Sequence, residues 1–223
     1  MGFRHEWKFE INEVDRRVLE ARLAAVMQPD PHAKNNRYRV RSLYFDTPAD
    51  TAFFEKIDGV NRREKFRIRM YDDDLSFLRL EKKSKVNGLC QKVTAPLTSE
   101  ETAWIIAGNI DFLRAAEHPL LRELYVKMRT QELRPKTIVE YTREPFVFSA
   151  GNVRVTIDAD LRTGVRSTDF LNPAQPLAPA ADAPPILEVK WDAFLPDIVR
   201  DAVGLESRRV GAFSKYAKCR IYG

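Results

Sequence analysis

Cationic side chains occupy every second position of one short segment, Lys65-Phe66-Arg67-Ile68-Arg69. Alternate residues of an extended strand share a face, so the three cations are expected about 7 Å apart on one side. That interval is close to the spacing of successive phosphates in an extended chain. Guanidinium groups bind phosphate oxygens in a bidentate manner and stay charged. The segment therefore predicts a phosphate site, although the solvated face of an ordinary sheet is the alternative.

Carboxylates accompany the cations on the same strand faces. Glu188 and Lys190 alternate in Leu187-Glu188-Val189-Lys190, so both side chains share a face. We expect Glu188 to hold Mg²⁺ or Mn²⁺ through an oxygen ligand while Lys190 meets phosphate. The arrangement recurs in two further pairs, Glu6 with Lys8 and Glu81 with Lys83. A polyanion and its metal need such a mixture, and a surface ion pair between strands is the other explanation.

Strict alternation of polar and apolar residues, typical of a strand with two different faces, recurs in about eight segments. These segments are residues 4–11, 37–45, 63–71, 77–85, 89–95, 137–148, 153–160 and 186–192. Further cations that could bind phosphate stand on their polar positions, namely Arg39, Lys83, Arg143 and Arg154, and Lys92 and Tyr141 occupy polar positions as well. Each predicted strand thus has one polar, mostly charged face and one apolar face.

Helices are predicted between the strands, over 13–27, 99–107, 119–133 and 196–203, with Thr98 as an N-cap. Their apolar stripes need a surface to cover. We therefore expect an α+β fold with an eight-stranded, largely antiparallel closed β-barrel, helices packed outside and charged faces inside. Residues 1–223 form a single domain in this interpretation. The segment 167–185, rich in Pro and Ala, is expected to be a long surface loop.

Several function classes find no support in the sequence. A GxGxxG or GxxxxGK[ST] phosphate loop is absent, and the three histidines are scattered. Phosphate would then have to be bound by side chains. The net charge of +5 fits an anionic partner. No apolar run reaches the roughly 18 residues of a membrane span, so we expect a cytoplasmic protein without such a span.

A short helix is expected to begin near the C-terminus, in Phe213-Ser214-Lys215-Tyr216. A hydroxyl and an ammonium group at a helix N-terminus favour anions. Ser214 and Lys215 are therefore candidate phosphate ligands, and a simple capping role for Ser214 is the alternative.

Taken in order along the chain, several blocks resemble the VTC domain, the polyphosphate polymerase domain of the triphosphate tunnel metalloenzyme (CYTH-like) superfamily. The resembling blocks are 4–8, Ser42-Leu43-Tyr44-Phe45-Asp46-Thr47-Pro48, 65–69, Leu80-Glu81-Lys82-Lys83, Glu140-Tyr141-Thr142-Arg143, 155–158, 187–190 and 213–216. The resemblance implies an eight-stranded tunnel. It also implies a phosphate path lined by Lys8, Arg67, Arg69, Lys83, Lys92, Arg143, Arg154, Lys190 and Lys215. Glu188 would hold the metal, with Glu6 as a second ligand, and Tyr141 and Ser214 would contact phosphate.

Three functions are compatible with such a site. The first is an ATP-dependent polyphosphate polymerase that transfers the γ-phosphoryl group to phosphate or to a growing chain. Its catalytic residues would be Arg67, Arg69, Lys83, Glu188 and Lys190. The second is a tripolyphosphatase or NTPase in which water is the acceptor. The third is a non-catalytic module that binds polyphosphate; nucleic acid is disfavoured because the aromatic residues lie mainly on the opposite strand faces.

Overall fold

The chain divides into two compact units whose sequences are interleaved. The computed structural model describes residues 5–87, 89–205 and 208–221. Unit 1 falls within Met1–Arg39, Tyr141–Leu161 and Ala181–Phe213, and unit 2 within Val40–Glu140, Arg162–Ala180 and Ser214–Gly223. Three strands pass through the boundaries of both units and contribute residues to each of them. The single domain over 1–223 remains a prediction.

Unit 1 contains an antiparallel sheet in which β1, β10, β8 and β7 are neighbours in that order. The bounds are β1 His5–Glu10, β2 Gln28–Pro29, β7 Arg134–Phe148, β8 Val153–Thr163 and β10 Ile186–Trp191. The register pairs Glu6 with Lys190, Lys8 with Glu188, and Glu188 in turn with Thr156. Acidic and basic side chains of the alternating pattern therefore come face to face across neighbouring strands.

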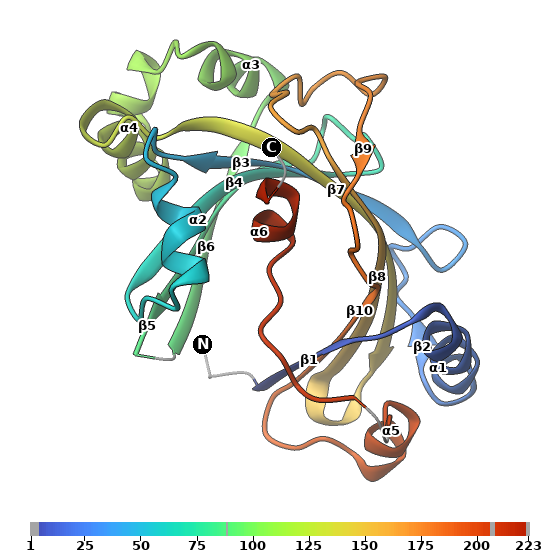
Figure 1. Cartoon of the computed structure of the whole chain (residues 1–223). Coiled ribbons are helices and arrows are strands. Elements are labelled where there is room, and N and C mark those ends of the chain that lie inside the picture. Colours follow the sequence, from blue (N-terminus) through green and yellow to red (C-terminus); the bar gives the residue numbers. More distant parts are fainter. Residues whose placement is uncertain (1–4, 88, 206–207, 222–223) are drawn as a thin grey trace. The chain divides into compact units, whose positions relative to one another are not determined.

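Helices cover the apolar face of the unit 1 sheet. α1 spans Glu13–Val26 and α5 spans Asp197–Ala202, with a short 3₁₀ turn, η2, at Ala150–Asn152. Asn12 caps α1 through a reciprocal bond with Asp15. The core joins both helices to alternate strand residues: Leu19, Leu23, Val153, Val155, Ile157, Leu187, Val189, Trp191 and Val199. Figure 1 shows α1 and α5 on the same side of these strands, which leaves the polar positions on the other face.

Unit 2 has the strand order β7, β3, β4, β5 and β6, again antiparallel wherever the register is defined. The bounds are β3 Tyr38–Asp46, β4 Arg63–Tyr71, β5 Leu78–Val86 and β6 Leu89–Leu97, with the two-residue β9, Ala178–Pro179, pairing with β8. The register places Tyr44 opposite Arg67 and Arg67 opposite Glu81. Polar residues of three strands thus form continuous rows.

Unit 2 contains the helices α2 Thr51–Ile57, α3 Ser99–Ala107, η1 Asp111–Ala115, α4 Pro119–Thr130 and α6 Lys215–Arg220. Its apolar face is covered by α3, η1 and α4, which contribute residues to the core. The core contains Leu43, Phe45, Phe66, Ile68, Leu80, Ile105, Leu113, Leu120 and Leu124. Figure 1 shows α3 and α4 on one side of the unit 2 strands and α6 on the other. α6 therefore lies on the polar face.

The eight predicted strands and five predicted helices, the short C-terminal one included, are all present, with ends shifted by a few residues. Thr98 caps α3 and forms a capping box with Glu101, as expected. Residue 4, the first residue of the first predicted strand, lies outside the described residues. The sheets and the helices that cover them confirm the α+β class, whereas closure into a barrel remains a prediction. Within the described residues, no helix is long and apolar enough to span a membrane.

Two local features differ from expectation. The predicted surface loop 167–185 carries Phe170, which is fully buried in the unit 2 core. Pro and Ala gave no periodic signal there, so a single aromatic anchor was not visible in the sequence. The helix α2 was not predicted. It has seven residues, and its N-cap, Asp50, has a left-handed backbone and makes no side-chain capping bond, so the usual start signal is missing.

Candidate functional site

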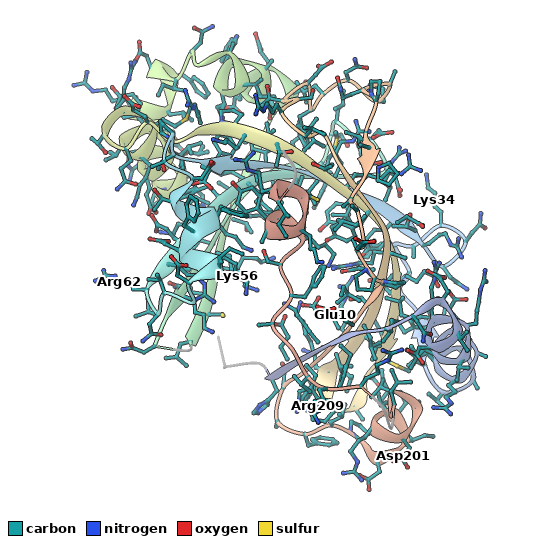
Figure 2. The ribbon with its side chains drawn as sticks, in the orientation of Figure 1. Glu10, Lys34, Lys56, Arg62, Asp201 and Arg209 are labelled. Carbon is teal, nitrogen blue, oxygen red and sulfur yellow. The ribbon has the colours of Figure 1, made fainter. Side chains whose placement is uncertain are left out.

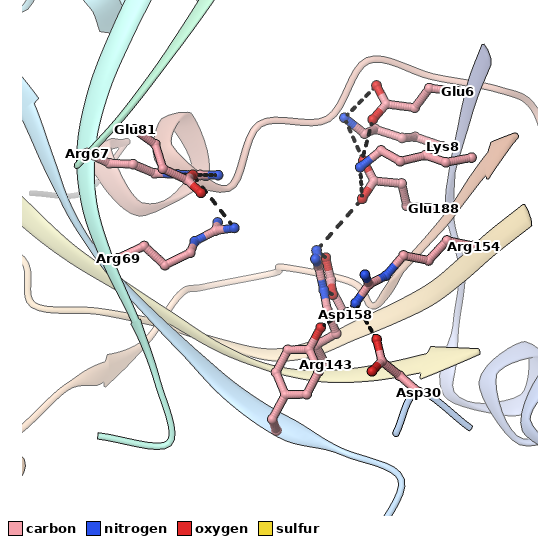
Figure 3. Close-up of polar contacts among 12 residues, drawn as sticks. Glu6, Lys8, Asp30, Arg67, Arg69, Glu81, Arg143, Arg154, Asp158 and Glu188 are labelled. Atoms are coloured by element: carbon pink, nitrogen blue, oxygen red, sulfur yellow. Dashed lines mark hydrogen bonds and ion pairs between the residues drawn. The ribbon is translucent and has the colours of Figure 1, made fainter. Parts of the chain in front are cut away.

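Unit 1 carries a carboxylate surrounded by three cations on its polar sheet face. The Glu188 carboxylate lies 3.3 Å from Lys8 Nζ, 3.1 Å from Lys190 Nζ and 3.7 Å from Arg143 Nη2 (Figure 3). Burial alone raises the pKa of Glu188, but the contact with Glu6 and the charges of Lys190, Lys8 and Arg143 hold it well below its usual value. Glu188 is therefore a buried, ionised carboxylate.

Glu6 joins the same group through the two lysines. Its carboxylate is 3.2 Å from Lys8 Nζ and 3.4 Å from Lys190 Nζ, so the two lysines bridge Glu6 and Glu188. The alternation of β1 and β10 brings the four side chains together, because the register sets Glu6 opposite Lys190 and Lys8 opposite Glu188. The predicted pairs on these two strands thus form one network.

Arg143 is held in place by Asp158. Arg143 Nε donates to Asp158 Oδ1 at 2.6 Å, and Nη2 donates to Oδ2 at 2.7 Å, which is the bidentate geometry that fixes a guanidinium plane. The guanidinium carbon lies 5.4 Å from the Tyr141 ring centroid. Burial opposes the charge, yet Asp158 and Tyr141 keep the pKa of Arg143 well above its ordinary value. Hereafter Glu6, Lys8, Arg143, Asp158, Glu188 and Lys190 are called the Glu188 cluster.

Two polar atoms beside the Glu188 cluster have no hydrogen-bond partner among the described residues. They are Thr156 Oγ1, on the residue paired with Glu188, and Arg154 Nε. Thr156 is buried, so its unsatisfied hydroxyl costs free energy unless something else binds it. Arg154 is otherwise engaged, since its Nη2 donates to Asp30 at 2.8 Å and to Tyr38 at 2.9 Å.

These oxygens fit a divalent cation. Glu188, Glu6 and the hydroxyl of Thr156 are hard oxygen donors, and Mg²⁺ is usually held by one or two carboxylates together with substrate phosphates. The described residues contain no group of three or more His, Cys, Asp and Glu side chains arranged for a metal. The donor set therefore fits a metal that shares its coordination with a phosphate ligand, rather than a metal caged by protein alone.

A cavity of about 340 Å³ in unit 1 reaches Lys8. It is lined by Lys8, Phe9, Glu10, Arg208, Arg209, Gly211 and Phe213. The segment 208–213, which follows α5 and is called the strap here, forms one wall of this cavity. Gly211 N donates to Lys8 O at 2.9 Å, and Val210 forms a β-bridge with Phe9. Figure 2 labels Glu10 and Arg209 on these two neighbouring segments. The basic end of the strap thus faces the strand that carries Lys8.

Unit 2 carries a second carboxylate among cations. Arg67 Nε donates to Glu81 Oε2 at 2.7 Å, and Arg69 Nη1 lies 3.9 Å from the same oxygen (Figure 3). Lys92 Nζ lies 3.7 Å from Oε1. Burial raises the pKa of Glu81, but the charges of Arg67, Arg69 and Lys92 lower it to about 2. Glu81 is therefore ionised at any pH at which the protein is expected to work.

Three lysines stand side by side across three strands of unit 2. The register pairs Lys65 with Lys83, and Lys83 with Lys92. Like charges placed directly opposite each other destabilise a sheet. Together with Arg67, Arg69 and Glu81 they are called the Glu81 cluster. It contains five cations and one carboxylate, so it attracts an anion strongly. A cavity of about 600 Å³ reaches Lys65 from the side of α2.

Two hydroxyl groups of β3 orient the arginines of the Glu81 cluster. Arg67 Nη1 donates to the phenol oxygen of Tyr44 at 2.8 Å, and Arg69 Nε donates to Ser42 Oγ at 3.2 Å. Both pairs are directly opposite in the register of β3 and β4. Each arginine thus has one fixed partner on the neighbouring strand.

The predicted site residues therefore fall into two groups. Unit 1 brings together Glu6, Lys8, Tyr141, Arg143, Arg154, Glu188 and Lys190, and unit 2 brings together Lys65, Arg67, Arg69, Lys83 and Lys92. Ser214 caps α6, and its hydroxyl accepts from Ala217 N at 3.3 Å, as the capping alternative predicted. Lys215 is the first residue of that helix. Their contact with phosphate remains a prediction.

Arg39 lies on a different strand face from most of this set. Alternation along β3 places Arg39 with Arg41, Leu43 and Phe45, and the latter two belong to the apolar core. Arg41 is buried there. Its Nε donates to Glu140 at 2.6 Å, and its Nη1 donates to the carbonyl of Asn172. The alternating arginines in 37–41 predicted that the face with Arg39 and Arg41 binds phosphate. The residues opposite the β4 arginines are instead Ser42 and Tyr44, on the other face of β3.

Sequence reasoning thus missed Ser42, Tyr44, Thr156 and Asp158 as site residues. Ser42 and Tyr44 alternate with apolar Leu43 and Phe45, so the strand pattern contained the signal. A hydroxyl is a weaker indicator of a phosphate site than an arginine, and the neighbouring strand was needed to reveal its partner. The bonds of Asp158 with Arg143 and the unsatisfied hydroxyl of Thr156 depend on contacts that no single strand predicts.

The fold is shared with known structures at low sequence identity. A candidate adenylate cyclase from Bacillus halodurans is 13% identical, with a TM-score of 0.50 over 90% of this chain and 86% of that chain. A protein from Pyrococcus horikoshii OT3 is 12% identical, with a TM-score of 0.50 over 92% of each chain. A candidate adenylyl cyclase from Hippeastrum, described as having a dominant triphosphatase activity, is 14% identical, with a TM-score of 0.54 over 96% of this chain and 93% of that one.

These similarities define the class of fold, antiparallel strands with helices on their apolar faces. The family follows from the sequence itself, since the model of the VTC domain matches residues 3–221. The chain belongs to the VTC domain family, which confirms the resemblance drawn from its sequence blocks. Among the curated proteins, none matches the chain.

Proposed function

We propose that this protein binds ATP, inorganic triphosphate or polyphosphate along its cationic strand faces and, with a divalent metal, transfers phosphoryl groups to form inorganic polyphosphate. The observation that carries the proposal is the row of Lys65, Lys83 and Lys92, in which three like charges stand directly opposite one another. Such a row is unfavourable in a free sheet and favourable when a polyanion lies across it. Membership of the VTC domain family supports the same substrate class.

The proposed architecture is the predicted closed tunnel of eight strands, whose charged faces line the path of the phosphate chain. The catalytic residues are Arg67, Arg69, Lys83, Glu188 and Lys190. The remaining phosphate contacts are Lys8, Lys65, Lys92, Tyr141, Arg143, Arg154, Ser214 and Lys215, whereas Arg39 is left out of this set because it lies on the other face of β3. Phosphoryl transfer makes few covalent demands on a protein, so these residues act by positioning the phosphates and compensating their charge.

The metal, Mn²⁺ or Mg²⁺, would be held by Glu188, Glu6 and the hydroxyl of Thr156. When bound, it would neutralise phosphate oxygens and so favour attack on the transferred group. The residues of this chain have separate tasks. Lys8 and Lys190 orient both carboxylates, and Arg143, fixed by Asp158, remains aligned with Glu188. Because an acceptor phosphate is already anionic, no general base is needed for chain growth.

A hydrolase would use the same residues with water as the acceptor. The Hippeastrum protein, which shares the fold, is described as having a dominant triphosphatase activity, so hydrolysis of triphosphate is the second candidate. A module that binds polyphosphate without turnover is the third. The three differ only in the products formed from ATP or from tripolyphosphate.

The test is incubation of the purified protein with ATP and Mn²⁺ or Mg²⁺, with polyphosphate length and free phosphate measured in the same samples. Growing chains that disappear in Glu188→Gln are the expected result. Phosphate release without chain growth would replace the polymerase by the hydrolase. Binding of tripolyphosphate without either product would support the binding module, and absence of both binding and turnover would refute the proposal as a whole.

A further inference from the structure

Tyr44 occupies the centre of the cationic face of unit 2. Its side chain is almost fully buried, 4% exposed, and its phenol oxygen accepts a hydrogen bond of 2.8 Å from Arg67 Nη1. The guanidinium carbon of Arg67 lies 5.7 Å from the ring centroid, and Lys65 Nζ lies 5.8 Å from it. A phenol in this position experiences the field of the cations proposed to bind phosphate.

The ring of Tyr44 is held by a second tyrosine. It stacks on Tyr216 of α6, with ring centroids 4.9 Å apart and an interplanar angle of 20°. Tyr216 in turn donates a hydrogen bond of 2.6 Å to Asp46 Oδ2, and Asp46 is buried. With Arg67 on one side and Tyr216 on the other, the phenol cannot easily turn away from the cations.

The charged and titratable groups around Tyr44 come from each neighbouring element. They are Lys65, Arg67 and Arg69 on β4, Glu81 on β5 through Arg67, Lys215 and Tyr216 on α6, and Asp46 on β3 itself. Burial raises the pKa of Tyr44, but the charges of Arg67, Lys65 and Arg69 lower it to about 7. In the ligand-free unit, a negative phenolate oxygen is thus stabilised near neutral pH.

We infer that Tyr44 is a positioning residue of the phosphate site in unit 2, which orients Arg67 and takes up a proton from solvent when an oligophosphate binds. The inference rests on the proposed function, because it presupposes that the Glu81 cluster binds the phosphates. It adds a residue and a proton to that site.

The reason is a competition between two anions for the same cations. A phenolate beside Arg67 partly satisfies the positive charge that would otherwise attract phosphate. A bound oligophosphate brings several negative charges close to the phenolate, which raises the pKa of Tyr44 and protonates it. The neutral phenol still accepts from Arg67, and its own hydrogen becomes a donor for an anion.

The sign of the pH dependence follows from linkage. Below about pH 7 the phenol of the free protein is already protonated, so binding takes up no proton there. Above about pH 7 each binding event must supply a proton to Tyr44, and the affinity that this residue contributes falls as the pH rises. Ionisation of the phosphates themselves acts in the opposite direction and is the same for any variant of Tyr44.

The experiment is calorimetric titration of wild type and Tyr44→Phe with metal-free tripolyphosphate, from about pH 6 to about pH 9, in two buffers of different ionisation enthalpy. Phenylalanine retains the stacked ring and loses only the hydroxyl. Tyrosinate absorbance in the near ultraviolet is recorded with and without ligand. Ser42→Ala is the matched control, because it removes the hydroxyl that holds Arg69 but no ionisable group.

We expect wild type to take up close to one more proton than Tyr44→Phe at about pH 8. The ratio of the two affinities should fall about fiftyfold between about pH 7 and about pH 9, with loss of tyrosinate absorbance on binding. Ser42→Ala should weaken binding with the wild-type pH profile. Wild-type binding with an affinity ratio independent of pH and no change in tyrosinate absorbance would overturn the inference alone. Failure of wild type to bind tripolyphosphate at any pH, both without metal and with Mn²⁺, would instead refute the proposed function.

Discussion

The Glu188 cluster of unit 1 and the Glu81 cluster of unit 2 have the same construction but different charge balance. Each has a buried carboxylate on a strand, with cations on the same and the neighbouring strands. In unit 1 the cations Lys8, Arg143, Arg154 and Lys190 are matched by the carboxylates Glu6, Asp30, Asp158 and Glu188. In unit 2 Arg67, Arg69 and Lys92 contact the carboxylate of Glu81, and Lys65 and Lys83 stand beside Lys92 in the same row of the sheet.

This difference indicates a division of tasks. A balanced cluster with an unsatisfied hydroxyl is suited to a metal cation, which needs negative oxygen donors. A cluster with excess positive charge is suited to the phosphates of the substrate. The two clusters should therefore respond to mutation in different ways.

The largest effect is expected for Glu188→Gln, which removes the charge of the proposed metal ligand but keeps its shape. We expect turnover of ATP with Mn²⁺ to fall about 100-fold or more. Tripolyphosphate binding without metal should not weaken, because Lys8, Arg143 and Lys190 lose a competing negative charge. The control is Glu13→Gln on α1, whose side chain is 64% exposed. If the variant kept wild-type turnover at saturating Mn²⁺, the metal would not belong to the Glu188 cluster.

Glu81→Gln should act on stability and on its pH dependence. The pKa of Glu81 is lowered from 4.5 to about 2, so its ionised form stabilises the fold fully above about pH 5 and ceases to do so as the pH falls towards 2. We expect the variant to lose about 2–3 kcal/mol of unfolding free energy at neutral pH. The difference from wild type should shrink on acidification.

Sulfate provides the complementary measurement for the same substitution. An anion that replaces the lost carboxylate should raise the melting temperature of Glu81→Gln more than that of wild type. Equal stabilisation of the two proteins by sulfate would show that loss of the Glu81 carboxylate creates no additional anion binding. The proposed excess of positive charge in the Glu81 cluster would then be refuted.

Lys83→Ala should separate binding from stability. Removal of the middle lysine of the row should weaken tripolyphosphate binding about tenfold. The ligand-free protein should become slightly more stable, by about 0.5 kcal/mol, because two like-charge contacts are removed. The measurements are calorimetric titration and thermal unfolding.

The control for this variant is Lys82, the preceding residue on the same strand. Lys82 points to the other face, where it donates to both oxygens of Glu123 on α4. Lys82→Ala should therefore lower stability and leave the affinity unchanged. If Lys83→Ala and Lys82→Ala had the same effects on tripolyphosphate affinity and on stability, the row of lysines would be an ordinary solvated surface.

The sequence predicts the strands and their faces better than it predicts the contacts between side chains. Period-two alternation predicted the strands because each has one apolar face under helices, as in Leu187 and Val189 against Glu188 and Lys190. It also placed Arg67, Glu81 and Glu188 correctly on polar faces. For β3 the same rule was misleading, because the buried pair Arg41 and Glu140 puts charge on the apolar face.

The partners of the site residues were beyond the reach of alternation. That Asp158 fixes Arg143, or that Tyr44 holds Arg67, depends on the register between neighbouring strands. A one-residue shift of register would exchange the two faces of a strand. Single-strand patterns predict which side chains share a face, whereas cross-strand contacts decide their charge state and their orientation.

The smallest effect, and the most specific one for the Glu188 cluster, is expected for Thr156→Val. Valine keeps the shape of threonine and removes a buried hydroxyl that has no partner among the described residues. The metal-free protein should gain about 1 kcal/mol of stability, and Mn²⁺ affinity should fall by about threefold to tenfold. The matched control is Thr163→Val on the same strand, whose hydroxyl donates to Cys219 O and accepts from Val165 N; it should lose stability and keep its Mn²⁺ affinity. If Thr156→Val gained stability without any change in Mn²⁺ affinity, its hydroxyl would be a packing defect, and the metal would have to be held by Glu188 and Glu6 alone.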